Sequence, residues 1–396
     1  MVLSRKMEAI EPSLTLKISA LAGRMKSEGK DVVSFGAGEP DFETPEYIKN
    51  AGKLAIDEGK TRYTPASGIA ELKKAVCARY FKKFGLEYEP SNVIISSGAK
   101  HSLYNTMQVL LNPGDEVIII TPYWLSYSEL VKMADGVPVF VEATEEDGFM
   151  PDPEDIEAAV TEKTKAIIIN SPSNPTGAVY SFDLLVKIAD ICRKYDIAII
   201  SDEIYDELVY DTDIKSIACV SEDAKARTII VNGMSKAYAM TGWRIGYVLC
   251  DKHIASVMSS VQSNATSNPC SIAQYASVAA LDNGIEELEN MRKVFAGRRD
   301  YICELIEDIP KLTCARPSGA FYALCGIQHF IGKSYNGTVI TDDVVFAEIL
   351  LKEKFVAVIP GTPFGAEGYI RLSYACSEEN IKKGLERIKE FLSEIG

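Results

Sequence analysis

The segment KAIIINSPSNPTGAVYSFDLLVKIADICRKYDIAIISD, residues 165–202, contains one complete strand–helix–strand unit. Its apolar runs KAIII and IAIIS are short and β-branched, which is typical of parallel strands covered on both faces. Between them, SFDLLVKIADICRKY repeats apolar residues at spacings of three and four, as a helix packed on a sheet does. The segment therefore predicts one βαβ unit of an α/β sheet.

The same alternation extends over much of the chain on both sides of this unit. Stretches of helical periodicity, such as HSLYNTMQVLL and YSELVKMA, separate further apolar runs. These runs are NVIISS, EVIIIT, VPVFVE, RTIIVN and GYVLC. Together with the first two runs they predict an α/β domain with a mostly parallel, seven-stranded sheet flanked by helices.

Beyond residue 268 the pattern changes. Long helical segments such as IEELENMRKVFAGRRDYICELIED are mixed with the short runs AFYALC, VAVIP and YIRLSYA, which favours a smaller α+β domain. The stretch SFGAGEPDFETP precedes the βα array and fits either part.

Composition and charge limit the kinds of partner. Apolar residues make up 47% of the 396 residues, enough for large cores. The 56 Asp and Glu outnumber the 42 Lys and Arg, and the formal net charge of −14 disfavours nucleic acid and anionic membranes. No apolar run approaches the roughly 18 residues of a membrane span, so a cytoplasmic location is expected.

Cysteine and histidine give no sign of a disulfide framework or a metal site. The nine cysteines are scattered without a CxxC pair and are expected to be reduced core residues. His101, His253 and His329 are far apart and lack ligand spacing, which disfavours both a metal site and a Ser-His-Asp triad.

Unusual polar residues follow three of the expected strands. Asn174 follows KAIII, Lys236 follows RTIIV, and both Asp202 and Tyr205 follow IAIIS. Ligands of open α/β sheets bind beyond the carboxyl ends of the strands, so these side chains are expected to meet in one crevice. A lone lysine is usually a solvated surface residue. The small and apolar neighbours of Lys236 favour instead an amine with a lowered pKa, suited to nucleophilic attack.

The stretch SKAYAMTGWRIGY, residues 235–247, resembles the cofactor-lysine signature of class I aminotransferases, which are pyridoxal 5′-phosphate (PLP) enzymes of fold type I. Further segments resemble that family in its order and spacing: FGAGEPDF, KTRYTPASG, PYW, NSPSNPTG, SDEIY and RLSYA. They span nearly the whole chain. The resemblance implies the PLP-dependent transferase fold, with a large domain over residues 46–279 and a small α+β domain over residues 1–45 and 280–396.

The resemblance also implies roles around the cofactor. Lys236 would carry PLP, and Asp202 would keep the ring nitrogen protonated by charge pairing. Tyr205 and Asn174 would hydrogen-bond the phenolic oxygen of the ring, and Trp124 would stack on its face. Without the family match, Asp202 would be read as a helix N-cap, and the others as a packed tyrosine, a turn asparagine and a core tryptophan.

The phosphate of the cofactor needs donors at fixed places, which the start of a helix supplies. By resemblance, the segment SSGAKHSLYN is that start, and its donors are the backbone N–H groups of Gly98, Ala99 and Lys100, supplemented by the side chains of Ser235 and Arg244. Ordinary turn chemistry is the alternative interpretation of the glycine.

Tyr63 in KTRYT is similar to the tyrosine that reaches the phosphate of a partner subunit. This implies a homodimer in which each site is completed by both subunits. The alternative is a surface loop tyrosine.

Arg371, within the strand-like run YIRLSYA, needs a carboxylate. The resemblance makes that partner the α-carboxylate of an amino acid, held with the help of Asn174 and the backbone N–H of Gly38. A structural salt bridge to an acidic residue is the alternative.

The choice of substrate depends on a second charged contact. The chain looks closest to the subgroup that is thought to bind an acidic side chain through the lysine of a G[GA]K turn and the threonine of PSxT, here Lys100 and Thr15. This favours L-aspartate as donor and 2-oxoglutarate as acceptor in a ping-pong reaction. Relatives that use prephenate tend to carry a basic residue where this chain has Glu11, which disfavours prephenate. Lys100 as an ordinary lysine of a first helical turn is the alternative.

Other activities remain open at this point. Aromatic, alanine or prephenate transamination and a PLP-dependent C–S lyase would use the same cofactor chemistry. The acidic charge disfavours a PLP-binding sensory domain of a DNA-binding regulator. A nucleotide-binding oxidoreductase would need GxGxxG after a first strand, and GAG at residue 36 is incomplete.

Overall fold

The computed structural model of the chain describes residues 14–396, except for the side chains of residues 14–16 and 19. Its main sheet has seven strands, in the order β2 (Val93–Ser96), β8 (Gly246–Leu249), β7 (Thr228–Gly233), β6 (Ala198–Asp202), β5 (Thr164–Asn170), β3 (Glu116–Thr121) and β4 (Val137–Glu142). Only β8 runs antiparallel to its neighbours, because no crossover helix separates it from β7. The predicted α/β fold with a mostly parallel sheet is confirmed.

Alternate side chains of each central strand enter cores on opposite faces of the sheet. Ile167 and Ile169 of β5 pack in one core, and Ile168 between them packs in the other. The helices of this part are α3 (Glu46–Asp57), α4 (Ala70–Phe84), α5 (Ala99–Leu110), α6 (Ser126–Met133), α7 (Pro153–Ala158), α8 (Phe182–Lys194), α9 (Glu222–Arg227), α10 (Lys252–Ala265) and α11 (Ser271–Asp282).

Helix α8 shows how local sequence produces this arrangement. The hydroxyl of Ser181 caps its start by accepting a hydrogen bond from the N–H of Leu184 at 3.2 Å. Leu184, Leu185, Ile188 and Cys192 recur at helical spacing and are buried against the sheet. The helix therefore lies where the periodicity of the opening segment predicts it.

A second, smaller sheet contains β14 (Ile359–Pro360), β15 (Tyr369–Ser373), β10 (Tyr322–Gly326) and β9 (Thr313–Cys314), all antiparallel. Two short pairs accompany it: β1 (Val33–Ser34) with β13 (Val356–Ala357), and β11 (Ser334–Tyr335) with β12 (Thr338–Val339). The helices of this part are α2 (Leu14–Ser27), α12 (Ile285–Glu307), α13 (Asp343–Lys354) and α14 (Glu378–Ser393). Short 3-10 turns cover Pro90–Asn92, Ile217–Cys219, Thr241–Trp243, Gln328–Phe330 and Thr362–Phe364.

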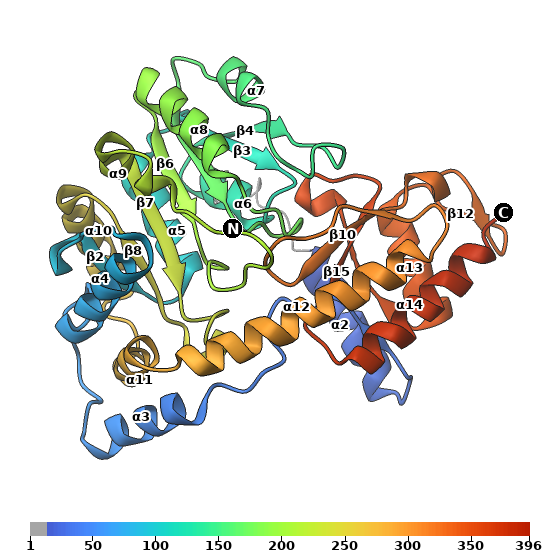
Figure 1. Ribbon diagram of the computed structural model, residues 1–396, viewed down its shortest axis with the longest axis horizontal. Coiled ribbons are helices and arrows are strands. Elements are labelled where there is room, and N and C mark those ends of the chain that lie inside the picture. Colours follow the sequence, from blue (N-terminus) through green and yellow to red (C-terminus); the bar gives the residue numbers. More distant parts are fainter. Residues whose placement is uncertain (1–13) are drawn as a thin grey trace, which may run out of the picture.

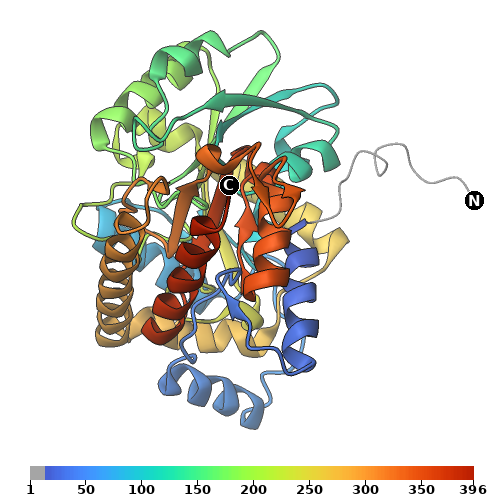
Figure 2. The same ribbon diagram turned by 90° about the vertical axis from the view of Figure 1, so that its right-hand side faces the viewer.

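The two sheets form adjacent parts of the molecule, and α12 runs from beside α11 toward the smaller part (Figure 1). In the orthogonal view, α14 stands between α12 and α13 and contacts both (Figure 2). The parallel pairing of β1 with β13 joins the N-terminal segment to the C-terminal part. On this ground we propose that residues 46–279 belong to the large domain and that residues 1–45 and 280–396 belong to the small domain.

All nine cysteines are free thiols. The expectation that they are core residues is wrong for Cys270, which is exposed, and only partly correct for those of intermediate burial, Cys77, Cys219, Cys314 and Cys376. Between residues 14 and 396 there is no helix with the length and apolarity needed to cross a membrane. The described part of the chain also contains no cluster of three His, Cys, Asp or Glu side chains suited to a metal ion.

Candidate functional site

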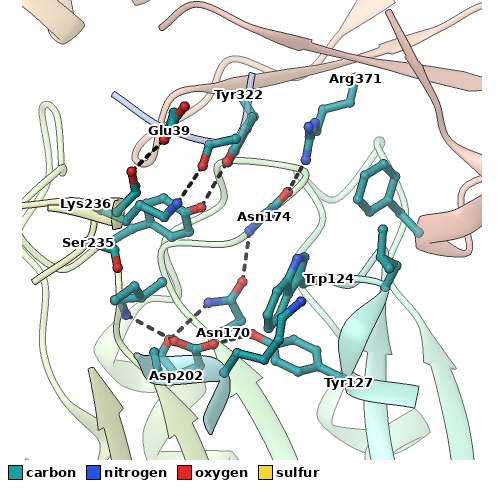
Figure 3. Close-up of a pocket in the computed structure, with 18 of the residues that line it drawn as sticks. Glu39, Trp124, Tyr127, Asn170, Asn174, Asp202, Ser235, Lys236, Tyr322 and Arg371 are labelled. Carbon is teal, nitrogen blue, oxygen red and sulfur yellow. Dashed lines mark hydrogen bonds between the residues drawn. The ribbon is translucent and has the colours of Figure 1, made fainter. Parts of the chain in front are cut away.

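A cavity of about 460 Å³ lies at the carboxyl ends of β5 and β6, between the large and the small sheet (Figure 3). Its walls include Tyr322 of β10 and Arg371 of β15 from the small sheet. The residues expected at the site that line it are Gly38, Ala99, Lys100, Trp124, Asn174, Asp202, Tyr205, Ser235, Lys236, Arg244 and Arg371. Segments distant in the sequence thus meet around one space of a size suited to a small molecule.

Lys236, in the connection between β7 and β8, reaches into the cavity. Its Nζ atom donates a hydrogen bond to the carbonyl oxygen of Gly38 at 2.5 Å and lies 5.9 Å from the ring centre of Tyr205. Burial lowers the pKa of Lys236 to about 8, because desolvation disfavours the ammonium form. The neutral, nucleophilic share of this amine near neutral pH is therefore larger than that of an ordinary lysine, which disfavours the interpretation as a solvated surface lysine.

Asp202 ends β6 and is 3% exposed. Its Oδ2 atom accepts a hydrogen bond from the hydroxyl of Tyr127 at 2.7 Å, and Oδ1 accepts one from the N–H of Ile204 at 3.2 Å. Burial nevertheless raises the pKa of Asp202 to about 6. A buried carboxylate that faces a cavity in this way would be stabilised by a cationic group of a ligand.

A hydrogen-bonded series connects Asp202 to the other wall. The side chain of Asn170 donates to the carbonyl oxygen of Asp202 at 3.0 Å and accepts from the N–H of Asn174 at 2.9 Å. The hydroxyls of Tyr205 and Tyr322 lie 3.0 Å apart and are both buried. The polar groups that line the cavity are therefore held in place by one another.

Ala99 and Lys100, at the start of α5, line one wall of the cavity. Gly98 is the N-cap residue of this helix and has a φ of 89°, a conformation that favours glycine. A Cβ atom at this position would also overlap the guanidinium of Arg244. Glycine here therefore lets Arg244 lie against the start of α5. The N–H of Gly98 donates to the carbonyl oxygen of Ser96 at 2.8 Å, so the expectation that it is a free donor for a phosphate is wrong. The N–H groups of Ala99 and Lys100, in the first turn of α5, are suited to such a contact together with Arg244.

Arg371 is 5% exposed and has no carboxylate partner in the described part of the chain. Its Nη1 atom donates to Oδ1 of Asn174 at 3.0 Å, its guanidinium lies 4.4 Å from the ring centre of Tyr322, and its Nε atom lacks a hydrogen-bond partner. Burial lowers its pKa. Within residues 14–396 no structural salt bridge accounts for Arg371, and a buried cation without such a partner calls for an anionic ligand.

Lys100 and Trp124 lie together on a further wall. The Nζ atom of Lys100 is 4.8 Å from the ring centre of Trp124, which itself packs edge-on against Tyr127. Burial, and secondarily the charge of Arg244, lower the pKa of Lys100. Within the described part of the chain, Lys100 is therefore one of four basic side chains that line the cavity, with Lys236, Arg244 and Arg371.

Of the described residues expected at the site, Gly98 and Tyr63 are not among those that line the cavity. Tyr63 is 90% exposed on the loop between α3 and α4. That loop is anchored to the start of α11, because the hydroxyl of Ser271 donates a hydrogen bond to the carbonyl oxygen of Arg62 at 2.7 Å. The side chain of Thr15 and residue Glu11 lie outside what the structure describes.

Sequence reasoning missed Tyr127, Asn170 and Tyr322, which all line the cavity. Asn170 had a signal, because it is the last residue of the apolar run KAIIIN, where ligands are expected. Tyr127 lies one helical turn after Trp124, but a tyrosine at that spacing reads as core. Tyr322 sits in an apolar strand of the small sheet and had no signal.

Residues 30–388 match the family described as aminotransferase class I and II. An aspartate aminotransferase from Bacillus subtilis (strain 168) is 45% identical over 393 residues, which cover 99% of both chains. An aspartate/prephenate aminotransferase from Cereibacter sphaeroides is 44% identical, over 98% of both chains.

Solved structures give the same result. The aspartate aminotransferase from Rhizobium meliloti has a TM-score of 0.96 at 42% identity, with 100% of both chains covered. The aspartate aminotransferase from Thermus thermophilus with maleate has a TM-score of 0.94 at 43% identity, with 99% of this chain and 100% of that chain covered.

Proposed function

The chain belongs to the aminotransferase class I and II family, and we propose that this PLP-dependent aminotransferase moves the amino group of L-aspartate to 2-oxoglutarate, with Lys236 as its cofactor lysine. The observation that carries the proposal is the presence of two unpaired cations, Arg371 and Lys100, on the walls of a cavity that also contains Lys236 and Asp202. A dicarboxylic substrate supplies one anion for each cation.

The residues of the cavity fit PLP by their chemistry. The carboxylate of Asp202 would face the ring nitrogen, and the start of α5 together with Arg244 would take the phosphate, with Ser235 as a further donor. Trp124 provides an aromatic face for the ring. When bound, PLP supplies an aldehyde that captures amino groups and a ring that accepts an electron pair.

The protein's own groups handle the protons. With its pKa lowered to about 8, the amine of Lys236 would be suited to accept the α-proton of the substrate and to return it at the C4′ carbon of the cofactor. Asp202, oriented by Tyr127, holds a proton on the ring nitrogen by charge pairing. Tyr205 and Asn174 would donate to the phenolic oxygen.

Arg371 binds the α-carboxylate in this proposal. Its guanidinium is already oriented by Asn174 and by the ring of Tyr322, so little side-chain entropy is lost when a carboxylate arrives. The nearly complete burial of Arg371 makes the resulting ion pair strong, because water does not screen it.

Lys100 binds the distal carboxylate in this proposal, together with Thr15, as in the lysine-using subgroup. Support comes from the position of Lys100 over Trp124 and from the names of relatives, which are aspartate aminotransferases. One of those relatives was solved with maleate, itself a dicarboxylate. Closure of the small domain over the substrate is expected to exclude water.

We also propose a homodimer with shared sites and a cytoplasmic role in amino acid metabolism. Support for the dimer is the exposed Tyr63, held on an anchored loop outside the cavity of its own chain. Nine free thiols support a reducing compartment.

The test is to incubate purified protein and PLP with L-aspartate and 2-oxoglutarate and to measure oxaloacetate and glutamate. L-alanine, L-phenylalanine, prephenate as acceptor, and a sulfur amino acid as lyase substrate are assayed in parallel. We expect aspartate to react fastest, and expect Lys236→Ala to lose both turnover and the visible absorbance of the lysine-bound cofactor. A higher kcat/KM with any of the other substrates would contradict the assignment of aspartate.

A further inference from the structure

Three buried polar side chains outside the cavity connect the strands that carry Asp202 and Lys236. The hydroxyl of Tyr80, on α4, donates to Oε2 of Glu203 at 3.1 Å and accepts from Nδ2 of Asn232 at 3.1 Å. Glu203 directly follows Asp202, and Asn232 lies near the end of β7, four residues before Lys236. We propose that Tyr80 and Glu203 are positioning residues for amino transfer, because their bridge sets the separation of Asp202 from Lys236.

The bridge lies where the main-chain ladder ends. Asp202 pairs with Val231 at the last registered position between β6 and β7, and the N–H of Glu203 donates to the carbonyl oxygen of Val231 at 2.8 Å. Beyond this point β6 and β7 have no further registered pair. A side-chain link there replaces the main-chain hydrogen bonds that no longer hold the strand ends together.

Glu203 is 3% exposed, and three hydroxyls donate to it. Besides Tyr80, these are Ser201 at 3.0 Å and Ser216 at 2.6 Å. A buried carboxyl group that accepts hydrogen bonds from three hydroxyls is held in one orientation, and so are the groups that surround it. An apolar side chain of similar size would fill the space without defining that orientation.

Helix α4 holds the same segment at two further points. Arg79 pairs with Asp206 at 2.5 Å and with Glu207 at 2.7 Å, and Lys83 donates to the carbonyl oxygen of Asp206 at 2.9 Å. The segment is therefore attached to α4 at Glu203, directly after Asp202, and again directly after Tyr205. The arrangement matters because misplacement of reacting groups by about 1 Å costs roughly a hundredfold in rate.

The inference rests on the proposed function and is tested with the holoenzyme. Tyr80→Phe keeps the buried ring and removes the bridging hydroxyl. We expect kcat to fall about tenfold with an unchanged KM for aspartate, as for a loss of alignment rather than of binding. We also expect a shift of about half a pH unit or more in the midpoint at which the visible absorbance of the bound cofactor titrates.

The matched control is Tyr335→Phe. Tyr335 is also buried, and its hydroxyl also bonds to a glutamate, Glu394, but it lies in the small domain away from the cavity. This variant is expected to lose stability comparable to that of Tyr80→Phe while keeping the kcat and the absorbance midpoint of the wild type.

A Tyr80→Phe enzyme that matches Tyr335→Phe in both readouts, with only its melting temperature lowered, would overturn the proposal. If Tyr80→Phe does not fold, Glu203→Gln decides by the same two readouts, since the amide leaves one of the hydroxyl donors unmatched. Failure of the proposed function is distinguished beforehand, because it would appear as absent turnover of aspartate by the wild-type enzyme.

Discussion

Arg371 is buried, positively charged and without a carboxylate partner among residues 14–396, which is a costly state for a side chain that serves only structure. We therefore predict that Arg371→Leu lowers kcat/KM for aspartate by about a thousandfold, the effect of losing one partner of a buried charge pair. The same change should not lower the urea midpoint of the apoprotein, since no internal ion pair is broken.

Arg299 is the matched control for Arg371. It is equally buried, but it pairs with Asp211 and Asp300, each at 2.5 Å. Arg299→Leu should therefore destabilise the fold by about 1–3 kcal/mol and leave kcat/KM unchanged. If the two variants exchanged these behaviours, Arg371 would be a structural residue.

The buried carboxyl group of Asp202 lowers the stability of the folded apoprotein by an amount that depends on pH. Its pKa is raised to about 6 in the folded chain, above the ordinary value, so ionisation destabilises the folded apoprotein. The cost is absent below the ordinary pKa, grows as pH rises between roughly 4 and 6, and is complete above the folded value.

Asp202→Asn should therefore stabilise the apoprotein by roughly 2–3 kcal/mol at pH 8 and by much less at pH 5. Turnover of aspartate should fall by about a hundredfold or more, because the amide cannot hold a proton on the ring nitrogen by charge. Urea unfolding at the two pH values and a steady-state assay check both parts. An equal stability change at pH 5 and pH 8 would exclude ionisation as the cause.

We predict that Lys100 distinguishes dicarboxylic from monocarboxylic donors. Lys100→Gln should lower kcat/KM for aspartate by about tenfold or more and leave that for alanine unchanged, since only aspartate loses an ion pair. Lys132→Gln, on α6, removes an ordinary surface lysine paired with Glu129 and serves as the control. An unaltered aspartate-to-alanine ratio in Lys100→Gln would move distal recognition to another residue.

At the scale of elements, the start of α5 and the end of α4 offer a direct comparison. Gly98 at the start of α5 has a φ of 89°, and Gly85 at the end of α4 has a φ of 71°. Alanine is strained at both positions by about 1 kcal/mol. Only at Gly98 would the added Cβ atom meet the guanidinium of Arg244, since the space at Gly85 is open.

Gly98→Ala should therefore weaken PLP binding by about tenfold or more, whereas Gly85→Ala should lose stability alone. Fluorescence titration of the two apoproteins with PLP, beside their melting temperatures, measures both effects. Equal affinity in the two variants would show that the start of α5 does not hold the phosphate.

At the scale of the whole molecule, the exposed Tyr63 can be used to test whether each site is completed by a partner subunit or formed by one chain alone. We predict that Tyr63→Ala lowers activity by about tenfold through the loss of a phosphate contact. Mixing unfolded Tyr63→Ala and Lys236→Ala chains and refolding them together should restore activity above that of either variant. In such a mixed dimer, the subunit with an intact Lys236 receives Tyr63 from its partner.

The readout for this experiment is specific activity against the mixing ratio, with Lys236→Ala refolded together with Gly85→Ala as the control for assembly. A mixture no more active than the sum of its components would show that Tyr63 acts within its own chain or not at all.

Patterns within short stretches of the sequence determined much of the secondary structure of this protein. The β-branched runs and the three-and-four spacing of segments such as that of α8 predicted each strand of the large sheet and the helix of the opening unit. The order of the motifs around Lys236, Asp202 and Arg371 identified the residues that surround the cavity. Such features are readable because periodicity and backbone preference act between residues close in sequence.

Only the tertiary structure decided how these residues are partnered. The reversed direction of β8, the hydroxyl of Tyr127 on Asp202, and the lack of an acid beside Arg371 all depend on which distant segments come together. The bridge from Tyr80 to Glu203 joins residues 123 positions apart. Burial and pKa arise from all surrounding atoms at once, so they exist only after the chain has folded.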